Sequence, residues 1–128
     1  MVTEITSGIR VSANATYQEE FSDPNGNNYF FAYEISIENQ SDFTVQLLSR
    51  HWYIFDSSGQ RSEVHGEGVI GEKPVLQPGE LFTYRSACTL STDIGKMSGN
   101  YTMQRMLDGV YFEALIPEMS LIAPYRLN

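Results

Sequence analysis

The residues with the clearest chemical potential lie near the middle of the chain, where Gly66-Glu67-Gly68-Val69-Ile70-Gly71 matches the pattern G-x-G-x-x-G. In a dinucleotide-binding site this pattern follows a strand and opens a helix whose N-terminus faces the pyrophosphate. Pro74 and Pro78 interrupt the segment where that helix would run, which argues against such a site. Consecutive amides in a loop can still bind an anion without a helix.

Both basic and acidic residues lie near this glycine motif, and they have opposite effects on anion binding. Arg61 and Lys73 flank Gly66, Gly68 and Gly71 and would add positive charge to a pyrophosphate or nucleotide site. Two glutamates in or beside the motif would repel the same ligand. The other interpretation is a structural or partner-recognition loop, in which the glycines serve backbone geometry. We expect the second use and keep the anion site as the alternative.

His51 and His65 are the two imidazoles of the chain and its candidate metal ligands. The sequence contains no H-x-H, H-E-x-x-H or C-x-x-C spacing, the patterns typical of preformed transition-metal sites. The two histidines could nevertheless meet a carboxylate across facing strands. A metal site at His51 and His65 therefore depends on how the strands pair.

Cys88 is the single cysteine, so the chain can form no internal disulfide. Its parity places it on the same face as Phe82 and Tyr84, which predicts a buried, unreactive thiol. No G-x-S-x-G elbow or comparable nucleophile motif occurs. We expect neither a catalytic residue nor a cofactor, and therefore no enzymatic activity.

Strands must position these residues, because apolar and polar side chains alternate along much of the chain. The parity of the apolar positions slips at Leu47-Leu48 and again at Pro117-Glu118, which predicts a β-bulge at each place. We expect a short helical turn over residues 91–96 and a helix-free loop from Gly66 to Gly79. The predicted strands cover residues 9–17, 29–38, 43–55, 60–64, 81–90, 99–103 and 110–121.

Seven to eight such strands predict an all-β fold, an immunoglobulin or fibronectin type III-like antiparallel β-sandwich. Tyr101, two residues before Met103, resembles the tyrosine corner of these folds. The length of 128 residues corresponds to one domain, so we expect residues 1–128 to form a single sandwich.

Charge and hydropathy exclude two kinds of partner. Eight Lys and Arg residues against sixteen Asp and Glu residues give a formal charge of −8, which repels phosphate backbones and anionic lipids. No apolar run is long enough to span a membrane, and the first ten residues lack the features of a signal peptide. We expect a cytoplasmic protein with no direct contact with nucleic acid or membrane.

Several runs of the sequence together resemble the ApaG family. They are His51-Trp52, the glycine motif, residues 76–86, residues 95–103 and residues 112–117. The resemblance spans nearly the whole chain and implies a fibronectin type III-like sandwich. It also implies a link to cobalt resistance and magnesium efflux, and related domains in an F-box protein and a polymerase-delta-interacting protein are interpreted as protein-binding.

The expected function is therefore a non-enzymatic module for protein–protein recognition. Recognition would use the loops between Gly66 and Gly79 or an unpaired sheet edge. The alternatives are a pyrophosphate- or nucleotide-binding protein and an indirect regulator of divalent metal. An exposed sandwich edge would also allow a homodimer.

Overall fold

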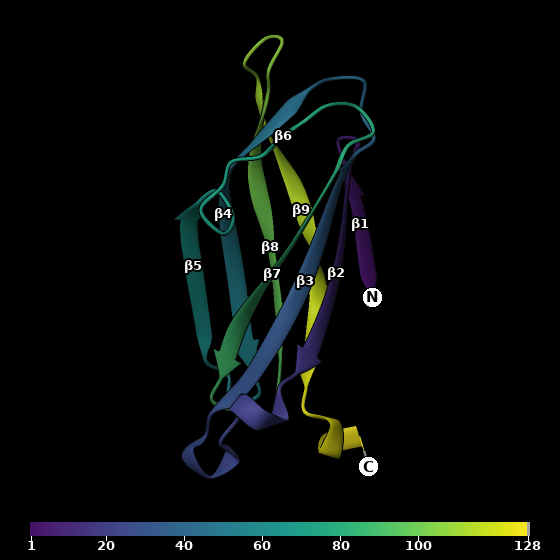
Figure 1. Cartoon of the computed structure of the whole chain (residues 1–128). Helices are drawn as coiled ribbons and strands as arrows, with labels where there is room; N and C mark the ends of the chain where they lie inside the picture. Colours follow the sequence, from purple (N-terminus) through teal and green to yellow (C-terminus); the bar gives the residue numbers. More distant parts are fainter. Residues whose placement is uncertain (128) are drawn as a thin grey trace.

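Two antiparallel β-sheets pack face to face in the computed structural model, which describes residues 1–127 (Figure 1). The first sheet contains β1 (Val2–Thr6), β2 (Ile9–Tyr17), β3 (Tyr29–Asn39) and β7 (Leu81–Leu90), hydrogen bonded in that order. This architecture confirms the predicted all-β, immunoglobulin or fibronectin type III-like sandwich.

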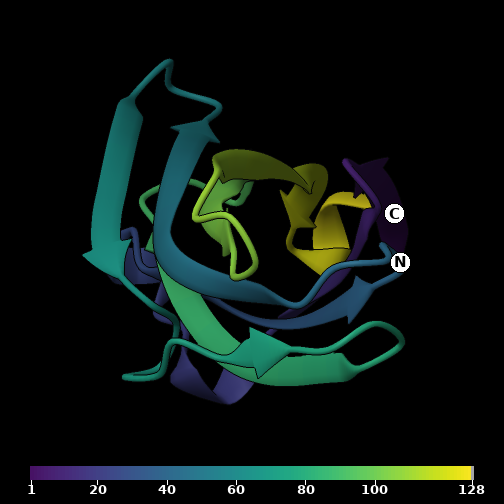
Figure 2. The same ribbon diagram turned by 90° about the horizontal axis from the view of Figure 1, so that it is seen from above.

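The second sheet carries the residues that could bind a ligand. Its strands follow the order β5 (Arg61–Glu67), β4 (Val45–Asp56), β8 (Ile94–Arg105) and β9 (Tyr111–Ile122). A two-residue strand, β6 (Val75–Leu76), pairs with the beginning of β4. Seen from above, β5 lies at the end of its sheet with β4 on one side (Figure 2).

Alternation of side chains explains why these segments form half-buried strands. On β3, the apolar residues of one parity face the second sheet, and the polar residues between them face solvent. Glu34 and Glu38 lie on the solvent face, where they pair with Arg85 and Arg10 respectively. The largest fully buried side chains come from both sheets: Tyr101, Phe31, Ile9, Ile35, Ile37, Leu47, Met97, Met103 and Leu121.

Both predicted bulges are present. The register between β4 and β8 shifts between Leu47 and Ser49, and the register between β8 and β9 shifts between Met97 and Gly99, opposite Pro117. Each bulge lets the apolar residues on both sides of it face the core, although their sequence parity changes. The parity slips in the sequence were therefore sufficient to locate these bulges.

Residues 1–127 contain nine strands, two more than the seven segments predicted from the sequence. The first addition is β1, whose residues are mostly exposed and so lack the alternation of a half-buried strand. The second is β6, which is too short to give a pattern. In addition, β5 extends to Glu67, so the strand includes the first two residues of the glycine motif.

Two local predictions from the sequence are wrong. The helical turn expected over residues 91–96 is a bend at residues 91–93, and β8 begins at Ile94 because its pairing with β9 starts there. Tyr101 does not act as a tyrosine corner, whose hydroxyl bonds to the backbone. Its hydroxyl lies 2.5 Å from the hydroxyl of Tyr84 in the facing sheet, so the contact joins the two sheets.

Candidate functional site

Strand pairing brings the two histidines together. His51 on β4 and His65 on β5 are direct cross-strand partners, and their ring centroids are 3.6 Å apart. The register follows from the hairpin at Ser57-Ser58-Gly59, where Gly59 adopts a φ of +87° and β4 turns into β5. Residues equidistant from Ser58 therefore face each other along the hairpin.

A carboxylate completes this cluster. Glu63 lies two residues from His65 on the same face of β5, and its Oε2 atom is 3.0 Å from Nε2 of His51 and 3.7 Å from Nε2 of His65. One ligand atom from each of the three residues lies within 4.8 Å of the other two. We call His51, Glu63 and His65 the histidine–glutamate cluster.

The surroundings hold the His51 ring in place and leave one side open. The ring stacks on Tyr53 with centroids 4.3 Å apart, and the His65 ring packs against it as well. The His51 side chain is 20% exposed, whereas those of His65 and Glu63 are 69% and 57% exposed. A shallow depression of about 390 Å³ adjoins the two imidazoles, and Asn100, Thr102 and Glu113 contribute to its lining.

From Gly68 on, the glycine motif forms a loop after β5 that lies beside the β4 bulge at Leu48. Val69 is fully buried, while Ile70 is 56% exposed at a φ of +44°. The amide of Gly68 donates to Leu48, and Val69 and Glu72 exchange two backbone hydrogen bonds of 2.8 and 2.9 Å. These three amides are therefore engaged within the protein and are not available to an anion.

At each glycine of the motif, a residue with a Cβ atom would meet a close contact or a strained backbone. A Cβ on Gly66 would lie 2.5 Å from the guanidinium of Arg50, which donates to the carbonyl oxygens of Glu67 and Gly68. A Cβ on Gly68 would lie 2.2 Å from the carbonyl oxygen of Glu72. Gly71 has open space around it but a φ of +79°, which favours glycine.

The basic residues expected to flank an anion are placed differently. Arg61 begins β5, five residues before Gly66, and its guanidinium lies over the Phe55 ring at 5.4 Å. Lys73 is close to the loop, but its ammonium pairs with Glu67 at 2.8 Å. That hydrogen bond and the positive charge lower the pKa of the Glu67 carboxyl. The structure thus brings Lys73 to the glycines and leaves Arg61 apart from them.

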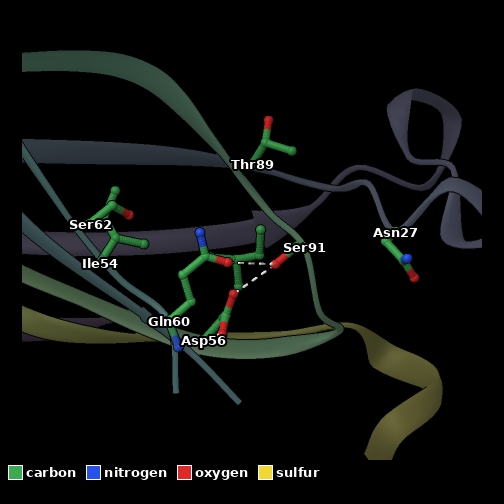
Figure 3. Close-up of a pocket in the computed structure, with 8 residues that line it drawn as sticks. Asn27, Ile54, Asp56, Gln60, Ser62, Thr89 and Ser91 are labelled. Carbon is green, nitrogen blue, oxygen red and sulfur yellow. Dashed lines mark hydrogen bonds between the residues drawn. The ribbon is translucent and has the colours of Figure 1, made fainter. Parts of the chain in front are cut away.

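A second depression, of about 270 Å³, lies between β7 and the β4–β5 hairpin (Figure 3). Asp56 and Gln60 line it, and the Ser91 hydroxyl contacts both side chains, at 2.8 and 3.4 Å. Hydrogen bonds, that from the Ser58 hydroxyl first among them, hold the pKa of Asp56 below its usual value. Asp56 organises the hairpin turn by accepting these bonds, so its carboxylate has a structural use.

Cys88 is half-buried rather than fully buried as the sequence predicted, whereas Tyr33, Tyr84 and Tyr101 are buried. Burial raises the pKa of the Cys88 thiol to about 11, and the thiol contacts the sulfur of Met97 at 3.7 Å. Burial also raises the pKa values of Tyr33, Tyr84 and Tyr101. A thiol with a raised pKa is a poor nucleophile at neutral pH, in agreement with the inert role expected for Cys88.

Sequence reasoning named both histidines but missed Glu63. The signal was present, because the turn centred on Ser58 places His51 opposite His65, and Glu63 shares the parity of His65. Counting from the turn would have found the cluster before any coordinates. A search for H-x-H, H-E-x-x-H or C-x-x-C could not find it, because the ligands come from two strands.

The fold and this surface define the class: an immunoglobulin or fibronectin type III-like β-sandwich with an imidazole–carboxylate cluster on the hairpin of one edge strand. Residues 19–105 match the ApaG domain family. The chain is 46% identical to Protein ApaG of Beijerinckia indica over 98% of this chain and 95% of that protein. It is 44% identical to Protein ApaG of Anaeromyxobacter dehalogenans over the full length of both.

The chain belongs to the ApaG family. A crystal structure of a Bordetella pertussis protein described as ApaA matches with a TM-score of 0.87 and 42% identity, over 91% of this chain and 94% of that one. These similarities confirm the resemblance read from the sequence motifs.

The helical segments of residues 1–127 are three 3₁₀ turns: η1 (Glu19–Phe21), η2 (Pro24–Gly26) and η3 (Pro124–Leu127). In this described part of the chain, no helix has the length and apolar character needed to cross a membrane.

Proposed function

We propose that this ApaG domain is a non-enzymatic module that recognises another protein by accepting an extended segment along the open edge of β5. The carrying observation is that β5 pairs with β4 alone within residues 1–127, and every β5 residue except Gly66 is exposed. An exposed edge presents unpaired amides and carbonyls that can bind a strand of a partner.

The hydrogen-bond pattern identifies which residues would pair with the partner. The amide of Asp56 donates to Gln60 at one end of the hairpin, and the amide of Gly68 donates to Leu48 at the other. Because bonded and non-bonded pairs alternate in an antiparallel ladder, the even-numbered residues of β5 bond to β4. The outward amides belong to the odd-numbered residues Arg61, Glu63, His65 and Glu67, and the Glu67 carbonyl already accepts a hydrogen bond from Arg50.

The face of β5 toward the core indicates the chemistry of the partner segment. Val64 pairs with the buried Trp52, yet Val64 is 41% exposed because no further strand covers it. Next to it, Ser62 and Ile54 line the depression between the hairpin and β7. A strand added to β5 would place alternate side chains over Val64 and this depression, so we expect an extended segment with apolar residues at every second position.

Two alternative functions are less well supported. A pyrophosphate or nucleotide site at Gly66, Gly68 and Gly71 would have to use backbone amides other than the three already bonded within the loop. A role linked to cobalt or magnesium, implied by the family resemblance, has the histidine–glutamate cluster in its favour. We propose a cytoplasmic location with either function.

The experiment compares capture of proteins from a lysate of the source cells by the wild-type domain, His65→Pro and His65→Ala, all in the presence of a metal chelator. Proline removes the outward amide of an edge strand and is tolerated there, whereas alanine keeps it. We expect a partner that the wild-type domain and His65→Ala retain and that His65→Pro loses.

Hydrogen exchange on the captured complex provides the independent measurement. The amides of Arg61, Glu63, His65 and Glu67 should become protected when the partner binds, because each would donate to the added strand. Equal retention by His65→Pro, or protection confined to other strands, would contradict edge recognition. Circular dichroism and urea unfolding verify that the proline variant keeps the fold.

A further inference from the structure

We propose that His51, Glu63 and His65 form a binding site for one divalent first-row transition-metal ion, on the outer face of the sheet that contains β4 and β5. The inference stands on the side-chain geometry of these three residues. It does not require the edge recognition proposed above, which uses backbone groups in the plane of the sheet.

The distances between the ligand atoms fit a metal centre. Bonds of about 2.0–2.1 Å to nitrogen and oxygen imply separations of about 3.0–3.4 Å between neighbouring ligand atoms. Here Glu63 Oε2 is 3.0 Å from His51 Nε2 and 3.7 Å from His65 Nε2, and the third pair lies within the 4.8 Å limit of the set. Small rotations of the exposed His65 and Glu63 side chains would close the remaining gap.

The backbone brings the two imidazoles close without any ion. By the alternation described above, His51 and His65 occupy a non-hydrogen-bonded pair, the position at which cross-strand side chains approach most closely. The stacking of His51 between Tyr53 and His65 restricts its ring. The entropic cost of ordering the ligands is therefore lower than for three independent surface side chains.

The donor set selects the class of ion. Two imidazole nitrogens and one carboxylate oxygen suit zinc, cobalt, nickel or copper, whereas magnesium and calcium require oxygen ligands. Three protein ligands leave further positions for water, and the depression lined by Asn100, Thr102 and Glu113 adjoins them. The formal charge of −8 on the chain favours the approach of a cation.

The test is isothermal titration of the metal-free full chain with Co²⁺, Zn²⁺ and Mg²⁺ in separate runs. The variants are His51→Ala, His65→Ala and Glu63→Gln, and the control is Glu34→Gln, a carboxylate on β3 in the other sheet. We expect one Co²⁺ or Zn²⁺ per chain with a Kd below about 100 μM, at least tenfold weaker binding by each histidine variant, and wild-type affinity for the control.

A ligand-specific readout accompanies the titration. The chain has two histidines, so their ring signals in NMR spectra can be assigned by the two alanine variants alone. Co²⁺ should give strongly shifted proton signals from both imidazoles, and Mg²⁺ should leave both unchanged. Urea unfolding of each metal-free variant verifies that lost binding does not result from lost folding.

Three results would overturn the proposal. The first is that the wild-type chain binds neither Co²⁺ nor Zn²⁺ with a Kd below about 1 mM. The second is that the histidine variants bind as tightly as the wild type. The third is a stoichiometry of one ion for two chains, which would mean that the cluster does not hold an ion alone. The test of edge recognition uses a metal chelator, so its outcome is separate from each of these.

Discussion

Replacing single glycines tests whether the glycine motif is a structural loop. Gly68→Ala and Gly71→Ala make the same chemical change three residues apart, and both glycines have a positive φ, of +60° and +79° respectively. A Cβ on Gly68 would lie 2.2 Å from the carbonyl oxygen of Glu72, whereas a Cβ on Gly71 would have no atom within 4 Å. The pair therefore separates the cost of a left-handed backbone from the cost of a backbone clash.

The expected magnitudes follow from these contacts. Alanine in the left-handed region costs about 1–2 kcal/mol, and for Gly71→Ala we expect only this loss of unfolding free energy. In Gly68→Ala, relief of the clash requires opening the two backbone hydrogen bonds between Val69 and Glu72, at about 0.5–1.5 kcal/mol each. Partial withdrawal of the buried Val69 from the core adds to this cost. We expect Gly68→Ala to lose about 2–4 kcal/mol more than Gly71→Ala.

The assay is urea unfolding at pH 7, followed by the fluorescence of Trp52. This residue is the single tryptophan and is 2% exposed, so its emission reports the opening of the core. With a slope of about 1.5 kcal/mol/M, the midpoints of the two variants should differ by more than about 1 M. Midpoints that agree within the error of the measurement would refute the assignment of Gly68 to a structural turn.

Three more predictions concern side chains in the core or beside it. Tyr84→Phe leaves the fully buried hydroxyl of Tyr101 without its partner and should lower the free energy of unfolding by about 1–3 kcal/mol. The double variant Tyr84→Phe, Tyr101→Phe should recover part of that loss, and a double-mutant cycle in urea unfolding measures the difference. Folding raises the pKa of the Cys88 thiol from 9.0 to about 11, so the unfolded chain loses this proton at lower pH than the folded chain. The free energy of unfolding should therefore fall as pH rises from about 9 to 11. The urea midpoint should fall less over that interval in Cys88→Ala. Val69→Ala should destabilise the domain by about 1–3 kcal/mol, and Ile70→Ala by less than about 0.5 kcal/mol, in thermal or urea unfolding, because only Val69 is buried.

Most of the sandwich could be predicted from the sequence, because period-2 alternation is a direct consequence of burying one face of a strand. The segments that became β2, β3 and β7 alternate along nearly their whole length, and the parity slip at Pro117 was enough to place a bulge. β1 gave no such signal, since its side chains are exposed on both faces. Its position depends on pairing with β2, which only the tertiary structure provides.

The glycine motif shows why the site was harder to predict than the fold. Its pattern suggested phosphate binding, but the use of each amide depends on contacts with residues distant in the sequence, such as Leu48. The burial of Val69 beside an exposed Ile70 is equally invisible in the sequence, because both are β-branched and apolar. By contrast, the pairing of His51 with His65 was implicit in the position of one turn.

The two proposed uses of β5 can be coupled, because both act on a strand that is held by one neighbour. An ion bound to His51 on β4 and to Glu63 and His65 on β5 would join the two strands, and so reduce the entropy that β5 loses when a partner segment pairs with its edge. The side-chain ligands project from the face of the sheet, while the outward amides lie in its plane, so one occupant does not exclude the other. Coupling is reciprocal, so a partner that orders β5 should tighten metal binding by the same factor by which the ion tightens partner binding.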